Sequence, residues 1–298
     1  MTFEQGVPRR TGHDGVLDAR LIVDCGNALG EGVQWHPRHR RLFWTDIDGR
    51  TLWSCDDRGG HVRQVALDER LCAFAFSGDG RMLGAFADGL AWLEPRSGHR
   101  SLFEPYMPGI AGVRMNDGAV DRQGRFVVGG YAERPDAPGT VVWSVDRGRV
   151  RALFDGVRTA NSTAFAPDGL VMYFADTPTG EIRFCSYNPA TGTPGAWQVF
   201  ARIDPAEGRP DGSCVDAEGG LWNARFGGGC VVRHLPDGRP DMVVRLPVLH
   251  VTCCTIGGNS MRRLFVTTAT RDGDGAGAGG LYAVDLPVRG LPAETYTR

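Results

Sequence analysis

Short runs of β-branched and aromatic residues alternate with turn-forming residues along the whole chain. Turn signals such as Ser-Gly-Asp-Gly at 77–80 and Pro-Asp-Gly at 167–169 separate these runs, and such punctuation is typical of hairpins. No stretch longer than a few residues has helical periodicity. Six of the runs start 40, 44, 46, 49 and 43 residues apart, at 41–47, 81–86, 125–129, 171–175, 220–224 and 263–268. The pattern therefore predicts an all-β protein built from a repeated unit.

The length of the repeat indicates which kind of all-β protein this is. The runs are followed by second strand-like segments, for example at 51–55 and 181–187. Units of roughly 40 to 50 residues with about four strands are the signature of a β-propeller. We therefore predict a six-bladed β-propeller with four-stranded antiparallel blades around a central channel. A β-sandwich is the main rival, but it does not require six near-equal repeats.

The chain outside the repeats also carries predictions. Residues 16–298 are expected to form one propeller domain, and the polar residues 1–15 a disordered N-terminal segment. Within the domain, segment 16–24 is expected to add an outer strand to the C-terminal blade, which closes the ring and removes a free sheet edge.

Composition narrows the possible partners and the compartment. A net charge of -2 and a pI near 6.4 provide no basic surface for nucleic acid. No apolar run approaches the length of a membrane span, and we expect no secretory signal in the polar first residues. The eight cysteines form no C-x-x-C pair, so we interpret them as reduced thiols of a cytoplasmic protein. Nothing distinguishes a monomer from a weak homodimer.

Candidate chemistry follows from the repeat. The first strand of each propeller unit lines the central channel, so the residues at its start gather around one axis. The six equivalent positions, within one residue each, are Glu31, Cys72, Asn116, Asn161, Asp211 and Cys253. Four of them offer oxygen donors, which hard divalent cations prefer. A site with so few protein ligands keeps positions open for water and substrate, which favours catalysis. The alternative is that Asn-Asp-Gly and Pro-Asp-Gly are ordinary turns.

Several motifs carry a resemblance to a known family. They are Gly-Glu-Gly at 30–32 followed by Trp35, Arg-x-Asn-Asp-Gly at 114–118, Asn161 running into Ala-Pro-Asp-Gly at 166–169 and Tyr-x-x-Asp at 173–176, and Pro-Asp-Gly at 210–212 followed by Asp216 and Leu-Trp at 221–222. In this order, over residues 20–290, they resemble the SMP-30/gluconolactonase/LRE family. Members of that family are six-bladed propellers, and many are divalent-metal lactonases that act on sugar lactones.

The resemblance implies roles for individual residues. Glu31, Asn161 and Asp211 would be the metal ligands, and Asp211 would also be the general base. Asn116 and Arg114 would bind substrate. The ion would be one divalent cation: calcium, zinc, manganese, magnesium or ferrous iron.

Two positions depart from the family pattern. Ser162 stands where glycine commonly follows the ligand asparagine. Gly-Tyr-Ala-Glu-Arg at 130–134 stands where relatives often have Gly-Thr-Met with a substrate-contacting glutamate nearby. Glu133 would fill that substrate-binding role.

The function predicted from these residues is metal-dependent hydrolysis of a sugar lactone to its aldonic acid. The metal would polarise the carbonyl, and Asp211 would take a proton from the attacking water. A metal-bound hydroxide that Asp211 only orients is the mechanistic alternative. Two other functions stay open: hydrolysis of another lactone or of an organophosphate ester on the same metal, and metal binding without catalysis.

Overall fold

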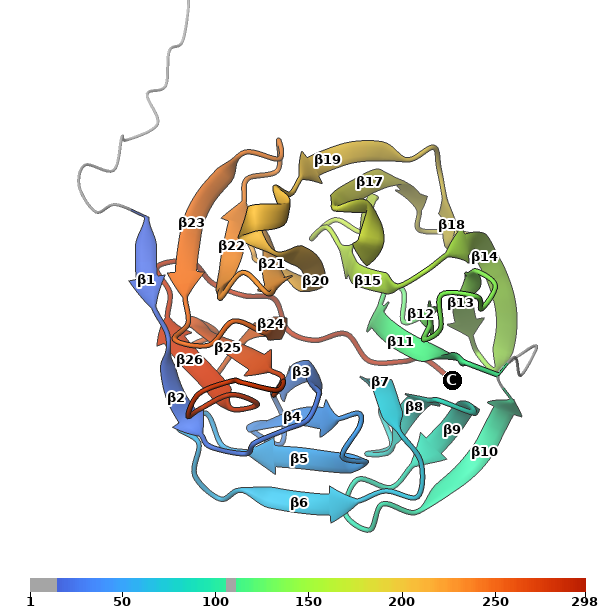
Figure 1. The fold of residues 1–298 in the computed structure, drawn as a ribbon. Helices are drawn as coiled ribbons and strands as arrows, with labels where there is room; N and C mark the ends of the chain where they lie inside the picture. Colours follow the sequence, from blue (N-terminus) through green and yellow to red (C-terminus); the bar gives the residue numbers. More distant parts are fainter. Residues whose placement is uncertain (1–14, 106–110) are drawn as a thin grey trace, which may run out of the picture.

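Six β-sheets surround a central axis in the computed structural model, which describes residues 15–105 and 111–298 (Figure 1). Within each sheet the consecutive strands pair antiparallel, so the all-β, six-bladed propeller predicted from the sequence is confirmed. The blades are numbered here in chain order, from the blade that begins with Gly30. The predicted N-terminal disorder lies, except for Gly15, outside the described residues.

The strands of the first three blades are as follows. Blade 1 has β3 (Gly30–His36), β4 (Arg41–Asp46), β5 (Thr51–Cys55) and β6 (Arg63–Ala66); blade 2 has β7 (Leu71–Phe76), β8 (Met82–Phe86), β9 (Gly89–Leu93) and β10 (Arg100–Pro105); blade 3 has β11 (Val113–Val120), β12 (Phe126–Ala132), β13 (Thr140–Asp146) and β14 (Arg149–Val157).

The remaining elements complete the ring. Blade 4 has β15 (Ala160–Phe165), β16 (Val171–Asp176), β17 (Glu181–Asn188), β18 (Thr193–Pro194) and β19 (Gln198–Arg202); blade 5 has β20 (Arg209–Val215), β21 (Leu221–Phe226), β22 (Cys230–His234), β23 (Pro240–Arg245) and β1 (Val16–Asp18); blade 6 has β24 (Val251–Gly257), β25 (Arg263–Thr268), β26 (Leu281–Asp285) and β2 (Arg20–Val23). The short 3-10 helices η1 (Thr177–Thr179) and η2 (Pro205–Glu207) precede β17 and β20.

The periodic apolar runs found in the sequence are the second strands of the blades, β4, β8, β12, β16, β21 and β25. These strands are almost fully buried, because each lies between the first and third strands of its own sheet and the neighbouring blades cover its two faces. The inner strands β3, β7, β11, β15, β20 and β24 lie nearest to the axis (Figure 1).

The N-terminal segment closes the ring, as predicted, but in two parts. β2 pairs antiparallel with β26, with Arg20 opposite Ala283, and completes blade 6. β1 instead joins blade 5, where it pairs in parallel with β23, and Val16 lies opposite Val243. One short segment therefore binds two neighbouring blades and covers the edge that β23 would otherwise expose.

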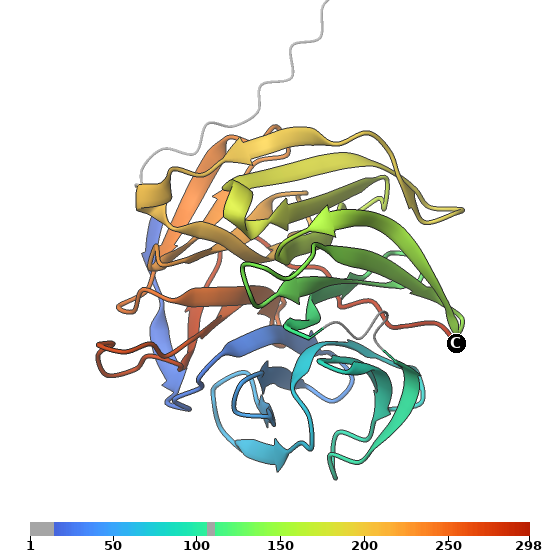
Figure 2. The ribbon, with the colours of Figure 1, turned by 45° about the vertical axis from the view of Figure 1, so that its right-hand side comes forward.

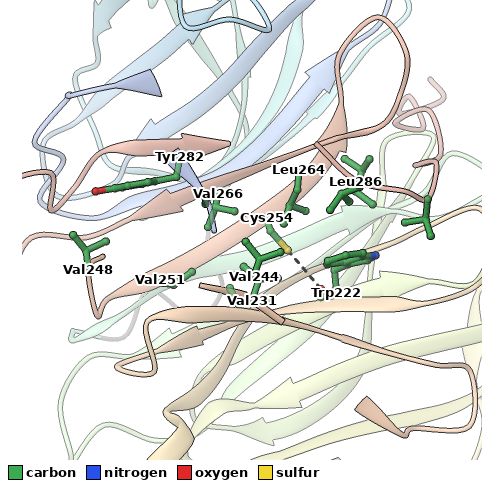
Figure 3. Close-up of a cluster of buried hydrophobic side chains, with 14 of the residues drawn as sticks. Trp222, Val231, Val244, Val248, Val251, Cys254, Leu264, Val266, Tyr282 and Leu286 are labelled. Atoms are coloured by element: carbon green, nitrogen blue, oxygen red, sulfur yellow. Dashed lines mark hydrogen bonds between the residues drawn. The ribbon is translucent and has the colours of Figure 1, made fainter. Parts of the chain in front are cut away.

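The core lies between adjacent blades. Figure 3 shows one such cluster, in which Trp222 of blade 5 packs near Cys254 and Leu264 of blade 6. The Trp222 side chain is fully buried, and its indole N–H donates to Asp216 Oδ2 at 2.8 Å. The buried polar end of the ring therefore has a partner, and its apolar area stabilises the contact between the two blades.

The C-terminal segment crosses one mouth of the central channel (Figures 1 and 2). It makes a bridge from Gly290 to Asp216 of blade 5 and another from Tyr296 to Ser77 of blade 2. Tyr296 is buried, and its hydroxyl oxygen accepts a hydrogen bond from Gly148 N at 2.8 Å. A cavity of about 140 Å³ lies between residues 291–294 and the inner strands. The C-terminal segment therefore covers part of this end of the channel.

Two further observations concern the whole chain. Among the described residues, no helix is long and apolar enough to span a membrane. The eight cysteines are free thiols.

Candidate active site

A break in the strand register occurs at the same level in all six inner strands. The breaks lie between Glu31 and Gln34, Leu71 and Ala73, Met115 and Gly118, Asn161 and Ala164, Pro210 and Ser213, and Val251 and Cys253. Such bulges bend a strand and re-aim its side chains, and they are common beside active sites. The residues predicted from the repeat lie at these breaks, which places them at one level around the channel.

The bulges also refine the predicted equivalence of these positions. Glu31 and Asn161 occupy the last paired position before the break, whereas Asn116 and Asp211 are the first unpaired residues within it. The equivalence therefore holds to within one residue, because the bulge accommodates the one-residue difference between the two pairs.

Three carboxyl groups come together in the channel: Glu31, Asp117 and Asp211. Burial, and then the charge of Asp117, raise the pKa of Glu31 to about 8. Burial raises the pKa of Asp117 to about 6. Burial and the charges of Glu31 and Asp117 raise the pKa of Asp211 well above its usual range. The three carboxyl groups thus repel one another when they are ionised, and Arg114 offsets this repulsion only in part.

Asp117 was not among the residues predicted from the sequence. It lies in an Asn-Asp-Gly segment that is typical of a turn, but β11 continues through it, and the bulge turns the side chain inward. Asp117 Oδ2 accepts from the backbone N–H of Thr163 at 2.8 Å, which connects blades 3 and 4. The side chain borders the cavity above the C-terminal segment.

A chain of hydrogen bonds joins the polar side chains of blades 3 and 4. Arg114 Nη1 donates to Asn116 Oδ1 at 2.6 Å. Asn116 Nδ2 donates to Ala160 O at 2.8 Å and lies 3.3 Å from Asn161 Oδ1. Asn161 Nδ2 donates to the hydroxyl of Thr177 at 2.8 Å. The structure therefore brings Arg114, Asn116 and Asn161 together and orients both amides.

Glu133, predicted as a substrate-binding residue, pairs with two arginines. Its Oε1 accepts from Arg70 Nη1 at 2.6 Å and from Arg114 Nε at 3.3 Å. Burial opposes the shift, but the hydrogen bond from Arg70 and the charges of Arg114 and Arg70 lower the pKa of Glu133. The Arg114 guanidinium also lies over the Tyr131 ring, 4.9 Å from its centroid. Arg70, which comes from the connection between β6 and β7, was not predicted, because no sequence motif links it to blade 3.

The other two inner-strand positions hold thiols that stay protonated. Burial raises the pKa of Cys72 to about 11. Burial and the neighbouring carboxylates raise the pKa of Cys253 well above its usual range. Neutral thiols are poor ligands for hard cations, so blades 2 and 6 supply no charged donor here.

The residues at the site fit a hard divalent cation. Asp211 Oδ1 is buried and has no hydrogen-bond partner, and such an oxygen needs a compensating group. Within residues 15–105 and 111–298, no three His, Cys, Asp or Glu side chains form a metal-binding group. A cation here would therefore rely on the amide oxygen of Asn161 and on water as well as on Glu31 and Asp211. This set of oxygen donors suits hard divalent cations such as calcium and magnesium.

The fold and site define a six-bladed propeller with an oxygen-rich centre in its channel. Comparison with known proteins identifies its family: residues 29–270 match the SMP-30/Gluconolactonase/LRE-like region, and the chain belongs to this family. It is 39% identical to the L-arabinolactonase of Azospirillum brasilense over 259 residues, and this alignment covers 84% of each chain. It is 31% identical to the pentonolactonase XacC of Haloferax volcanii, over 91% of this chain and 95% of the relative.

A solved structure agrees with the same conclusion. The crystal structure of regucalcin from Agrobacterium tumefaciens, described as a calcium-binding protein, superimposes with a TM-score of 0.90 at 28% identity. It covers 97% of this chain and 100% of its own. The predicted resemblance to the family is thus confirmed.

The local backbone explains the departure from the family pattern at Ser162, where glycine is common. Ser162 has φ +58°, and Gly32 in the bulge of blade 1 has φ +60°. This left-handed conformation is favourable for glycine and strained for other residues. The backbone of the bulge thus explains why glycine suits this position, and Ser162 keeps the same backbone at the cost of some strain.

Proposed function

We propose that this protein hydrolyses a sugar lactone to the corresponding aldonic acid, with one divalent cation and with Asp211 as general base. The observation that carries the proposal is the buried Asp211 carboxylate, which has an unpartnered oxygen beside two other carboxyl groups. The L-arabinolactonase and pentonolactonase relatives support lactone hydrolysis and favour five-carbon lactones as the first substrates to test.

Glu31, Asn161 and Asp211 would hold the cation, whose identity among calcium, zinc, manganese, magnesium and ferrous iron stays open. When bound, the cation would polarise the lactone carbonyl and offset the negative charge of the site. Asn161 suits this role because its amide N–H donates to Thr177. Its amide oxygen accepts from Asn116 Nδ2 at 3.3 Å and keeps a second lone pair for the cation.

Asp211 would move the proton. Asp211 has a pKa that is raised by burial and by the charges of Glu31 and Asp117, an effect that a bound cation would offset in part. It takes one proton from the attacking water as the new carbon–oxygen bond forms at the carbonyl carbon. It returns that proton to the ring oxygen as the bond between this oxygen and the carbonyl carbon breaks, which yields the open hydroxy acid.

Arg114, Asn116 and Glu133 would bind the substrate. The Arg114 guanidinium is a suitable partner for sugar hydroxyls and for the carboxylate of the product. Its orientation is supported by Asn116, by the backbone oxygen of Met115 at 2.8 Å and by Glu133. We propose that Glu133 acts chiefly by holding Arg114 and Arg70 at the mouth of the channel.

A second candidate function is cation binding without catalysis. The specific observation in its favour is the likeness to a regucalcin described as a calcium-binding protein. This alternative expects tight cation binding with no lactone turnover. The cytoplasmic location and the monomeric or weakly dimeric state stay predictions.

The test is proton release from freshly prepared aldonolactones, with metal-stripped protein re-supplied with single divalent ions. The panel includes arabinono-, xylono- and gluconolactone. We expect one ion to restore hydrolysis and Asp211→Asn to lower kcat by about 10²-fold or more. Asp211→Asn protein that binds the ion and retains most of its activity would reject the assignment of the base. Tight ion binding by the wild type without turnover of any lactone would favour the binding function.

A further inference from the structure

A line of buried polar side chains runs from the third strand of blade 5 to the candidate site. His234 Nε2 lies 2.8 Å from Arg225 Nη2, and Arg225 Nη1 lies 2.5 Å from Asn223 Oδ1. Asn223 Nδ2 in turn lies 3.0 Å from the backbone oxygen of Asp211. Asn223 is 0% exposed and Arg225 is 1% exposed. None of these three residues belongs to the predicted site.

Arg225 is an unusual member of this line. Its guanidinium is buried, and no carboxylate of the described residues lies within 4.0 Å of it. Burial without a charged partner is costly, and it lowers the pKa of Arg225 to about 10. His234 Nδ1 lies 2.9 Å from the carbonyl of Gly238, so this nitrogen carries the proton and Nε2 accepts from Arg225.

The arginine determines which way the amide of Asn223 points. A guanidinium only donates hydrogen bonds, so the group that faces Arg225 must be the amide oxygen. The NH2 group must then face the opposite direction, toward the channel. There it contacts Asp211 O, Ser213 Oγ at 2.9 Å and Ser162 Oγ at 3.3 Å. The donors and acceptors around Asn223, and not only the shape of its surroundings, thus fix the orientation of its amide.

These contacts join two bulges from different blades. Asp211 lies in the bulge of blade 5, and Ser213 is the first paired residue after it. Ser162 lies in the bulge of blade 4, directly after Asn161. Ser162 Oγ and Ser213 Oγ also lie 2.5 Å apart. One amide group therefore contacts the backbone oxygen of Asp211 and the hydroxyl of Ser162, the residue that follows Asn161.

We propose that Asn223, oriented by Arg225, is a positioning residue that sets the spacing between Asn161 and Asp211 for cation binding. This inference rests on the proposed function, because it concerns the same two ligands. Groups that orient metal ligands typically change the affinity for the metal by 10- to 100-fold when they are removed. The network at blade 5 contacts Asp211 directly and Asn161 through its neighbour Ser162.

The main test compares Asn223→Leu with Tyr187→Phe. Tyr187 is buried, and its hydroxyl donates to Asp121 Oδ2 at 2.9 Å. This contact also joins two blades, but Asp121 follows the far end of β11, about 16 Å along the chain from Asn116. Calorimetry with single divalent ions is expected to show a dissociation constant raised 10- to 100-fold in Asn223→Leu and less than twofold in Tyr187→Phe. An Asn223→Leu protein that binds the ion within threefold of the wild type overturns the proposal.

A second measurement needs no metal. Amide hydrogen exchange of the metal-free protein is expected to be at least tenfold faster over residues 209–215 in Asn223→Leu than in the wild type. Residues 251–257 serve as the internal reference and are expected to keep the wild-type rate. Unchanged exchange over residues 209–215 contradicts the proposal even if the wild type binds no cation. A wild type that neither binds a cation nor hydrolyses lactones would instead contradict the proposed function.

Asn223→Asp covers the case in which the leucine variant does not fold. The aspartate keeps the shape of the side chain and an acceptor for Arg225, but it lacks the amide N–H. Its added negative charge alone would strengthen cation binding. Equal or weaker binding in this variant therefore supports the positioning role, and tighter binding overturns it.

Discussion

Asn161 donates its amide hydrogen to the hydroxyl of Thr177 at 2.8 Å, and Thr177 donates in turn to the backbone oxygen of Pro210 at 2.9 Å. The pair connects a proposed ligand in blade 4 to the residue just before Asp211 in blade 5. Because Thr177 accepts the amide N–H, the amide oxygen of Asn161 points away from Thr177, where it accepts from Asn116 Nδ2 at 3.3 Å.

Thr177→Val should therefore weaken divalent-cation binding about tenfold, since the amide of Asn161 loses the acceptor that orients it. Thr177→Ser keeps the hydroxyl and should bind the ion within about twofold of the wild type. Titration calorimetry of both variants checks this expectation. Equal affinities in the valine and serine variants would show that the hydroxyl has no orienting role.

The strained backbone at Ser162 predicts an order of stability. Ser162→Gly relieves the left-handed conformation but loses the hydroxyl contacts with Ser213 and Asn223, so its free energy of unfolding should change by less than about 1 kcal/mol. Ser162→Ala keeps the strain and loses the same contacts, and should be less stable than the glycine variant by about 1 kcal/mol. Urea unfolding of the metal-free proteins measures both. An alanine variant as stable as the glycine variant would argue against strain at this bulge.

Stability should fall in mild acid because His234 is buried. Burial lowers its pKa from 6.5 to about 4. Between these values the unfolded chain binds a proton that the folded protein does not, so the free energy of unfolding decreases as the pH falls from 6.5 to 4. The contribution of His234 is about 3 kcal/mol over this window.

His234→Gln keeps an acceptor for Arg225 and should show a shallower decrease. His36, whose pKa is also lowered to about 4, chiefly by burial, should account for part of the dependence that remains. The exposed His61 supplies the control His61→Gln. Denaturant unfolding at several pH values measures the slopes, and equal slopes in His234→Gln and the wild type would contradict the assignment.

Glu133 should affect substrate binding more than the chemical step. Glu133→Gln removes the charge that holds Arg70 and Arg114, so KM should rise about tenfold while kcat changes less than about threefold. Glu218→Gln is the matched control, because Glu218 pairs with Arg233 of blade 5 at 3.0 Å. Steady-state hydrolysis of the best lactone gives both constants. A large loss of kcat with KM unchanged would place Glu133 in the reaction itself.

The fold was predictable because its signals are local. The second strand of each blade is buried on both faces, so it stands out as an apolar run between turn residues, and six near-equal spacings leave few architectures. The parallel pairing of β1 with β23 was not predicted. This pairing requires the free edge of β23 in the folded ring, and no pattern in residues 16–18 predicts which strand they will pair with.

The site was predictable only in part, for a physical reason. Residues at the start of an inner strand could be aligned within one position, but the bulge decides which side chains face the channel. Asp117 was missed because Asn-Asp-Gly usually marks a turn. Asn223 was missed because it lies on a second strand, and its contacts with Ser162 arise only when blades 4 and 5 meet.

The pairing of β2 with β26 also affects how the chain is made. Arg20 and its partner Ala283 are separated by 263 residues, so β2 leaves the ribosome long before its partner. Closing so long a loop is slow compared with forming a hairpin. A nascent chain that ends before Leu281 already contains Glu31, Asn161 and Asp211, yet blade 6, which must separate blade 5 from blade 1, is incomplete. We therefore expect the ring to close, and the site to assemble fully, only after β26 has been made.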